Sequence, residues 1–416
     1  MTTRATKRRF VIDGSMAKGG GGFTYLINII PELAAQAPDD QFKVILGHEP
    51  LAAAIPDLPN VEIDFVGRVG VLKRLQFTYG QAAQKARDWD ADLYFSASDW
   101  LPPTLDCPGA VALRNPNIFA EGAAKDLSWR QKIRLQILRG AARLSARVAE
   151  RVMFVSDDSA DWIGDSIGLP EAKRTVIHHG IDASEWQQAD PKPSLHSRPF
   201  ILSVSSVYPY KNYVRLIEAY TQMARRNPDV PDLVIIGDNQ CDATMQAMFE
   251  ARDAAGEFAE WIHILGEVPY AEIREYYREA SLFVFPSYLE TFGHPLLEAM
   301  AAEVPLVASD IPVFREVAQD AAIYADPFSV EALATAMEQA MASETGRKNL
   351  IKRGRERLQE FRWSRSATKL LAMFDEILEE DSKPKFAEVT NLPLPNWRDL
   401  RPATRIAARV ATTPIS

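Results

Sequence analysis

Two glutamates with seven residues between them, Glu290 and Glu298, stand before and after a predicted helix start. The apolar residues 282–285 predict a short strand, and residues 295–302 have the spacing of an amphipathic helix that begins with a proline. Carboxylates are good acceptors for paired hydroxyl groups, and the free N–H groups of a helix start attract an anion. The stretch therefore indicates a binding site for a ligand that carries both hydroxyls and a phosphate.

The elements that must position these glutamates are a strand, a tight loop and a helix. This is the repeating unit of an open α/β sheet, and such sheets bind ligands at the carboxyl ends of their strands. Two glutamates alone are more often a surface-loop residue and a solvated helix residue. The turn at Phe292 and Gly293 and the strand predicted over residues 304–309 favour the ligand site instead.

The stretch resembles the donor-site signature of the retaining glycosyltransferases of the two-domain GT-B fold, glycosyltransferase family 4 (glycosyl transferases group 1) in particular. The resemblance implies that Glu290 is a catalytic residue that faces the donor sugar, and that Glu298 holds the ribose of a nucleotide sugar. It also implies that Phe292, Gly293 and His294 line the donor site between the two glutamates.

A basic loop residue follows the apolar strand predicted over residues 200–204. Lys211 precedes a predicted helix, where its ammonium group is expected to stabilise a departing diphosphate. The family usually has an arginine five residues earlier as well, but this chain has Ser206, a donor-site candidate that brings no charge. Part of the phosphate neutralisation is therefore expected from other groups. A solvated loop lysine is the alternative explanation of Lys211.

A glycine-rich turn follows the first predicted strand, residues 10–13. Gly20, Gly21 and Gly22 lack the spacing of the dinucleotide fingerprint, and helical periodicity begins at Phe23. Glycine lets a backbone approach a phosphate closely, although flexible glycine loops are common. The resemblance implies that this loop faces the donor diphosphate and the acceptor.

Two polar residues, Arg114 and Asn115, follow the strand predicted over residues 110–113 and are acceptor-side candidates. Many family members have a histidine near this point, and this chain has none. A turn fixed by the Asn-Pro pair and a structural arginine is an equally good explanation. On the donor side, the resemblance places the backbone near Val268 against the nucleobase.

The alternation of strands and helices predicts an α/β protein with doubly wound parallel sheets. The resemblance implies the GT-B fold, with two Rossmann-like domains facing a central cleft. We expect an acceptor-side domain over residues 1–185, a nucleotide-sugar-binding domain over residues 186–380, and a loosely attached tail over residues 381–416. The amphipathic helix predicted over residues 363–380 lies where family members cross back to the first domain.

Composition excludes several classes of protein. The chain of 416 residues is 47% hydrophobic and 25% charged, with a net charge of −9 that argues against a nucleic-acid partner. Its two cysteines, Cys107 and Cys241, are too few for a disulfide framework or a cysteine-based zinc site. No apolar signal segment follows the basic N-terminus, and no apolar run approaches the length of a membrane span. We therefore expect a cytoplasmic protein.

The most basic segment is residues 125–151, in which Arg139, Arg143, Arg147 and Arg151 recur at the spacing of one helical face. A basic amphipathic helix can lie on an anionic membrane surface, so peripheral contact with the inner face of the membrane is one prediction. A helix that covers the sheet and has a solvated arginine face is the other.

The resemblance implies retaining transfer of a hexose from a nucleotide-diphosphate sugar to an acceptor hydroxyl, on a glycan or lipid-linked saccharide of polysaccharide biosynthesis. No Asp-x-Asp motif stands in a suitable strand-end loop, and we expect neither a metal nor a cofactor. A nucleotide-sugar epimerase and a non-catalytic sugar-nucleotide-binding protein remain alternatives. A glycosidase is disfavoured because its two carboxylates must face one bond from opposite sides.

Overall fold

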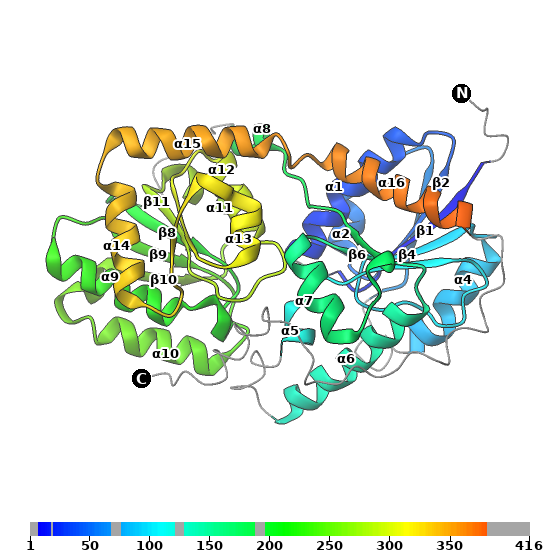
Figure 1. The fold of residues 1–416 in the computed structure, drawn as a ribbon, viewed down its shortest axis with the longest axis horizontal. Helices are drawn as coiled ribbons and strands as arrows, with labels where there is room; N and C mark the ends of the chain where they lie inside the picture. The colour runs from blue at the N-terminus through cyan, green and yellow to red at the C-terminus, as the bar shows by residue number, and fades with distance from the viewer. Residues whose placement is uncertain (1–6, 18–19, 68–75, 121–128, 188–195, 381–416) are drawn as a thin grey trace. The chain divides into compact units, whose positions relative to one another are not determined.

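The computed structural model describes residues 7–17, 20–67, 76–120, 129–187 and 196–380 (Figure 1). These form two compact units: unit 1 takes in residues 7–120, 129–180 and 363–380, and unit 2 takes in residues 181–362. The predicted tail, residues 381–416, lies outside the described residues.

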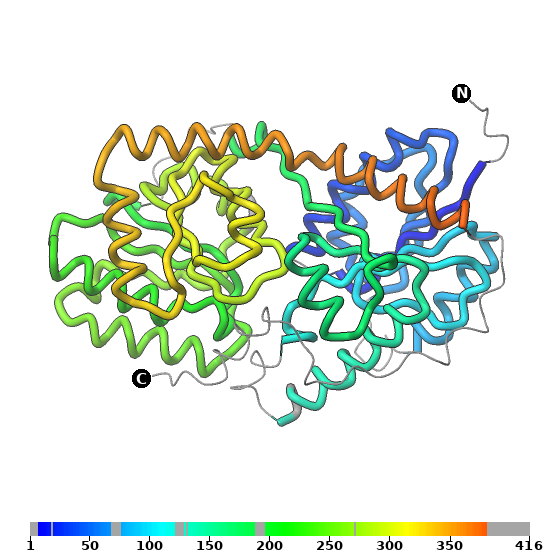
Figure 2. Tube along the Cα trace, in the orientation of Figure 1, coloured from blue at the N-terminus to red at the C-terminus, as the bar shows by residue number. Residues whose placement is uncertain are grey.

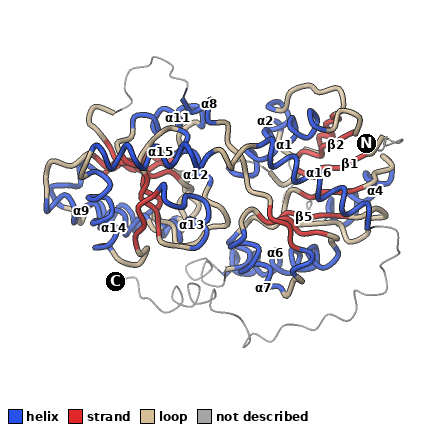
Figure 3. The backbone as a smooth tube through the Cα atoms, turned by 45° about the horizontal axis from the view of Figure 1, so that its top comes forward, coloured by secondary structure: helices blue, strands red, loops and turns tan. Residues whose placement is uncertain are grey.

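Unit 1 is built on a parallel sheet whose described strands run in the order β3-β2-β1-β4-β5-β6-β7. The strands are β1 (Arg9–Gly14), β2 (Gln41–Leu46), β3 (Val61–Phe65), β4 (Leu93–Ser96), β5 (Gly109–Ala112), β6 (Arg151–Phe154) and β7 (Arg174–Val176). The helices of the unit include α1 (Gly20–Gln36), α2 (Glu49–Ala54), α4 (Ala82–Asp88), α5 (Pro116–Phe119), α6 (Trp129–Val148), α7 (Asp157–Ile167) and α16 (Trp363–Glu380). Figure 3 shows α1 and α16 on one face of this sheet and α6 and α7 on the other.

Unit 2 has a second parallel sheet, with the described strands in the order β10-β9-β8-β11-β12-β13. The strands are β8 (Phe200–Val204), β9 (Asp232–Ile236), β10 (Ile262–Gly266), β11 (Leu282–Phe285), β12 (Leu306–Ser309) and β13 (Ala322–Ala325). Its helices include α8 (Ala183–Gln187), α9 (Tyr213–Arg226), α10 (Asp242–Asp253), α11 (Tyr270–Glu279), α12 (His294–Ala301), α13 (Pro312–Ala318), α14 (Val330–Met341) and α15 (Glu344–Leu358). The predicted α/β fold with two doubly wound parallel sheets is confirmed.

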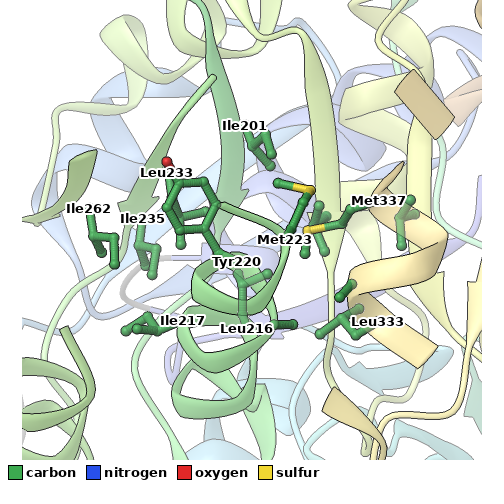
Figure 4. Close-up of a cluster of buried hydrophobic side chains, with 14 of the residues drawn as sticks. Ile201, Leu216, Ile217, Tyr220, Met223, Leu233, Ile235, Ile262, Leu333 and Met337 are labelled. Atoms are coloured by element: carbon green, nitrogen blue, oxygen red, sulfur yellow. The ribbon is translucent and has the colours of Figure 1, made fainter. Parts of the chain in front are cut away.

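The central strands of unit 2 are mostly apolar because helices cover both faces of the sheet. β8, β9, β11 and β12 are buried along their whole length. On one face, α9 packs Leu216, Tyr220 and Met223 against Ile235 of β9 and Met337 of α14 (Figure 4). Their spacing along α9 is that of a single helical stripe, so the sequence pattern alone sets the face that is buried.

The chain returns from unit 2 to unit 1 at Trp363 and continues there as α16, drawn in orange in Figure 2. Phe374 of α16 packs on Phe10 and Phe95, with ring centroids 5.1 and 5.6 Å away. The predicted return to the first domain is therefore present. Unit 2 accordingly ends at Arg362, whereas the sequence analysis carried its domain to residue 380.

The predicted row of four arginines on one helix is wrong at its last member. α6 ends at Val148, and Arg151 is the first residue of β6. Glu150 donates its backbone N–H to the carbonyl of Gly109 at 2.8 Å, so the chain has already entered the sheet at this point. Arg151 pairs with Glu380 of α16, at 2.6 Å from its carboxylate.

Among the described residues, no helix is both long and apolar enough to cross a bilayer.

Candidate functional site

Ligands of a doubly wound sheet bind where the strand order reverses, beyond the carboxyl ends of the two strands on either side. In unit 2 this point lies between β8 and β11, because β9 and β10 extend the sheet to one side and β11 to β13 extend it to the other. Lys211 follows β8 and Glu290 follows β11. The topology therefore brings the two predicted catalytic residues, 79 positions apart in the chain, to one place.

Lys211 and Glu290 form a buried ion pair. The Nζ of Lys211 lies 2.5 Å from Oε1 of Glu290, and both side chains are 11% exposed. The same carboxylate oxygen accepts the hydroxyl of Ser287 at 2.8 Å. The ammonium group also lies 5.3 and 5.4 Å from the ring centroids of Tyr210 and Phe285, within the range of cation–π attraction. The rings of Tyr210 and Phe285 and the carboxylate of Glu290 therefore hold the ammonium group of Lys211 at the end of the sheet.

Asn212 fixes the loop that carries Lys211. Its backbone is left-handed, with φ of 64°, which asparagine tolerates better than most residues. Its amide donates to the carbonyls of Pro286 at 3.1 Å and Pro327 at 2.7 Å. The backbone N–H of Tyr288 in turn donates to the carbonyl of Tyr210 at 3.0 Å. The loops after β8 and β11 are therefore bonded to each other.

The start of α12 faces this same edge of the sheet. The helix begins at His294, one residue earlier than predicted, with Gly293 as its N-cap at φ of 91°. A Cβ on Gly293 would stand 2.8 Å from the ring of Phe314, so both the backbone angle and the space require glycine. Phe292 is buried, with its ring edge-on to Phe361 at 5.8 Å. The side chain of Phe292 therefore packs within unit 2, and its part in donor binding stays a prediction.

Glu298 lies inside α12 and is 8% exposed. Its carboxylate accepts the phenol of Tyr277 at 2.9 Å and lies 3.2 Å from Nδ1 of His294, one helical turn earlier. The two contacts use different oxygens of the carboxylate. Tyr277 and His294 therefore hold the plane of the carboxylate in a defined orientation.

The remaining donor-side candidates of unit 2 lie at the same edge of the sheet. Ser206 is half-buried just beyond β8, and Val268 is half-buried just beyond β10. Gly237, directly after β9, passes close to this loop: a Cβ there would lie 1.8 Å from the carbonyl oxygen of Ser205. Glycine at this position lets the loop that carries Ser206 lie against the sheet.

In unit 1, the predicted glycine turn is partly helical. Gly20, Gly21 and Gly22 form the first turn of α1, so the helix begins before Phe23, where apolar periodicity starts. A Cβ on Gly20 or Gly21 would meet no atom within 4 Å, which leaves the backbone there open. The helix start follows β1, at the point where the strand order of this sheet reverses between β1 and β4.

Arg114 reaches the same edge of unit 1. Its guanidinium donates to the carbonyl of Ala97 after β4 and stacks on the ring of Tyr25, 4.5 Å from the centroid. Its backbone N–H donates to Asp99 at 3.1 Å. Burial lowers the pKa of Arg114 and raises the pKa of Asp99.

Asn115 caps α5 by accepting the backbone N–H of Asn117 at 3.1 Å. Both candidates thus have structural contacts, and their acceptor role stays a prediction.

Several residues of these two edges escaped the sequence analysis. Asp13, at the end of β1, accepts the phenol of Tyr94 at 2.6 Å and the backbone N–H of Ser15 at 2.9 Å. Burial raises the pKa of Asp13 and so favours its neutral form. Tyr277 has no motif around it that marks a partner of Glu298. Asn212 did carry a signal, since asparagine between a strand and a helix is a common cap.

Comparison with known proteins agrees with the resemblance of unit 2 to the glycosyl transferases of group 1. Residues 184–357 match the sequence model of the family described as glycosyl transferases group 1. The chain is 25% identical over 371 residues to O-antigen chain mannosyltransferase B of Escherichia coli, covering 83% of this chain and 93% of the relative. It is 26% identical over 355 residues to the phosphatidyl-myo-inositol mannosyltransferase of Mycobacterium tuberculosis, covering 80% and 88%.

Solved structures share the fold. The glycosyltransferase WaaG, described as involved in lipopolysaccharide biosynthesis, matches with a TM-score of 0.66 and 17% identity, over 88% of this chain and 98% of its own. HepE of Anabaena, solved with UDP and glucose, matches with a TM-score of 0.68 and 17% identity, over 89% and 100%. Residues 184–357 therefore match the glycosyl transferases group 1 family, and the chain has the GT-B fold of solved glycosyltransferases.

Proposed function

We propose that the protein transfers a hexose, with retention of anomeric configuration, from a nucleotide-diphosphate sugar to a hydroxyl of a glycan or lipid-linked saccharide. Two mannosyltransferases among its relatives, one of an O-antigen chain and one of phosphatidyl-myo-inositol, support the hexose and the acceptor class. HepE, crystallised with UDP and glucose, supports a nucleotide-sugar donor.

The observation that carries the proposal is the buried pair of Lys211 and Glu290 at the point where the strand order of unit 2 reverses. When the bond from the anomeric carbon to the diphosphate oxygen breaks, the electron pair leaves with the diphosphate. The ammonium group of Lys211 and the positive end of the α12 dipole can stabilise that charge. Glu290 then exchanges its ammonium partner for hydroxyls of the sugar.

Lys211→Ala tests this role. We expect kcat for sugar transfer to fall by roughly a hundredfold or more, because a preorganised charge is removed from the leaving group. The melting temperature should also fall, because Glu290 stays buried without its ammonium partner, so turnover is compared at a temperature where both proteins are folded. The measurement is turnover of UDP-, GDP- and ADP-linked glucose and mannose, with the products identified by mass spectrometry.

Lys348→Ala is the matched control, since that lysine is 73% exposed on α15. It should keep wild-type turnover. Near-normal activity of Lys211→Ala would show that another cation holds the diphosphate. An epimerised donor without a transferred sugar in the wild-type reaction would favour the nucleotide-sugar epimerase.

Glu298→Gln tests the proposed ribose contact. The substitution removes a charged acceptor, and hydrogen bonds to charged groups contribute about 1.5–3 kcal/mol. We expect nucleoside diphosphate affinity, measured by calorimetry, to fall by about tenfold or more. Tyr277→Phe should cause a smaller loss, because it leaves the carboxylate but removes the phenol that orients it. Unchanged affinity in Glu298→Gln would end the ribose assignment.

We further propose that α6 brings the protein to an anionic lipid surface, through a different face from the one predicted. Arg139 donates to the carbonyls of Ile118 and Phe119 at 2.7 and 3.2 Å, so it is engaged within unit 1. Large apolar side chains are instead exposed along α6, at a spacing that places them in one stripe. They are Trp129, Ile133, Ile137 and Leu144, between 40% and 67% exposed.

Exposed basic residues, Lys132, Arg134 and Arg143, lie among the stripe residues along α6. An apolar stripe with basic neighbours is the arrangement of helices that lie in a membrane interface. Each basic side chain near an anionic surface contributes about 1 kcal/mol, an attraction that salt screens. The surface would hold the enzyme near a lipid-linked acceptor.

Liposome co-sedimentation tests the lipid contact. Wild-type protein should bind vesicles of phosphatidylcholine mixed with phosphatidylglycerol at low salt, and should not bind phosphatidylcholine alone. Lys132→Glu with Arg134→Glu should weaken binding at least about 30-fold, and Ile133→Ser with Ile137→Ser should also weaken it. Lys348→Glu with Lys352→Glu, on exposed α15, is the charge-matched control. If all the variants bind the vesicles as well as the wild type does, or if the wild type does not bind them, α6 is a solvated structural helix.

A further inference from the structure

Two histidines and an aspartate meet at the opposite edge of the unit 2 sheet, where its strands begin. Asp232 is the first residue of β9, His263 lies in β10, and His196 lies four residues before β8. The Nε2 atoms of His196 and His263 lie 2.9 and 3.1 Å from the same oxygen, Oδ2 of Asp232. The three atoms all lie within 4.8 Å of one another.

These separations are close to those of a metal shell. With metal–ligand distances of about 2.0–2.1 Å, adjacent ligand atoms of a tetrahedral zinc site lie roughly 3.3–3.4 Å apart. The two distances to Oδ2 of Asp232 are shorter than this by only a few tenths of an ångström. Small shifts of the side chains would therefore admit an ion between the carboxylate and the two imidazoles.

The surroundings of Asp232 select the kind of ion. Its other oxygen, Oδ1, lies 3.0 Å from Nη1 of Arg198 in an ion pair, and Oδ2 lies toward the imidazoles. A single carboxylate oxygen disfavours calcium and magnesium, whose binding rests on several carboxylate and carbonyl oxygens. Two imidazoles favour zinc and its transition-metal neighbours instead.

An ion can also reach the cluster from solvent. The side chain of Asp232 is 6% exposed, but those of His196 and His263 are 17% and 32% exposed. We propose that His196 Nε2, Asp232 Oδ2 and His263 Nε2 bind one divalent ion of the zinc class, with water completing the shell. Because the ion would join the chain before β8 to β9 and β10, the site stabilises the sheet at the edge away from Lys211 and Glu290.

The test uses full-length protein that has been stripped with a chelator and dialysed. Added zinc should be retained at about one equivalent more than in the variant His263→Gln, as measured by elemental analysis. The glutamine amide can still donate to Asp232, so this variant keeps the hydrogen bond but loses the imidazole ligand. Zinc at roughly a hundred times its dissociation constant should raise the melting temperature of the wild type by about 5 °C.

His196→Gln should lose the same equivalent of zinc. Agreement between the two variants would show that the loss does not come from a folding defect of one of them. His48→Gln, at a histidine of unit 1 outside this cluster, should keep it. Cobalt(II) in place of zinc should give the visible absorption of a low-coordinate site in the wild type and not in His263→Gln. Zinc retained equally by the wild type and His263→Gln, or not retained by the wild type, would reduce the cluster to a hydrogen-bond network around Asp232.

Discussion

In unit 2, the edge of the sheet where its strands end, beyond β8 and β11, depends on a buried ion pair formed by residues of two different loops. Lys211 and Glu290 are each 11% exposed, so neither charge can be removed without leaving the other poorly solvated. Asn212 and the Tyr288–Tyr210 hydrogen bond hold the two loops together, and the strand order brings them side by side. Under the proposed function, the pair is a preformed place for a negatively charged group, and Glu290 occupies it until a phosphate arrives.

At the same edge, the partial positive charge of a helix start adds to the charge of the lysine side chain. Where the family pattern has an arginine, this chain has Ser206, which cannot neutralise a phosphate. The start of α12 can do so in part, because Gly293 adopts a left-handed backbone that only glycine fits beside Phe314. In the proposed reaction, the positive end of the helix dipole and one lysine would stabilise the leaving diphosphate.

Local patterns predicted the elements well and the contacts between distant elements poorly. β11 begins and ends where its apolar run does, and α12 begins one residue before the predicted start, because Gly293 and not Pro295 sets the cap. Arg151 was placed on α6 because arginine spacing continues through the end of the helix, whereas the entry into β6 is set by pairing with Gly109. The contacts of Tyr277 with Glu298 and of Asp232 with its two histidines join separate elements. The spacing of residues along the chain does not predict such contacts.

Calorimetry of UDP and GDP binding to the wild type, Lys211→Ala, Glu290→Gln and the double variant tests the central claim most directly. If the pair is a preformed phosphate site, Lys211→Ala should weaken binding by about tenfold or more, the worth of a charged hydrogen bond. Glu290→Gln should bind at least as tightly as the wild type, because the lysine loses its competing carboxylate, and the double variant should resemble Lys211→Ala. Unchanged affinity in Lys211→Ala, or an equal loss in Glu290→Gln, would contradict the account.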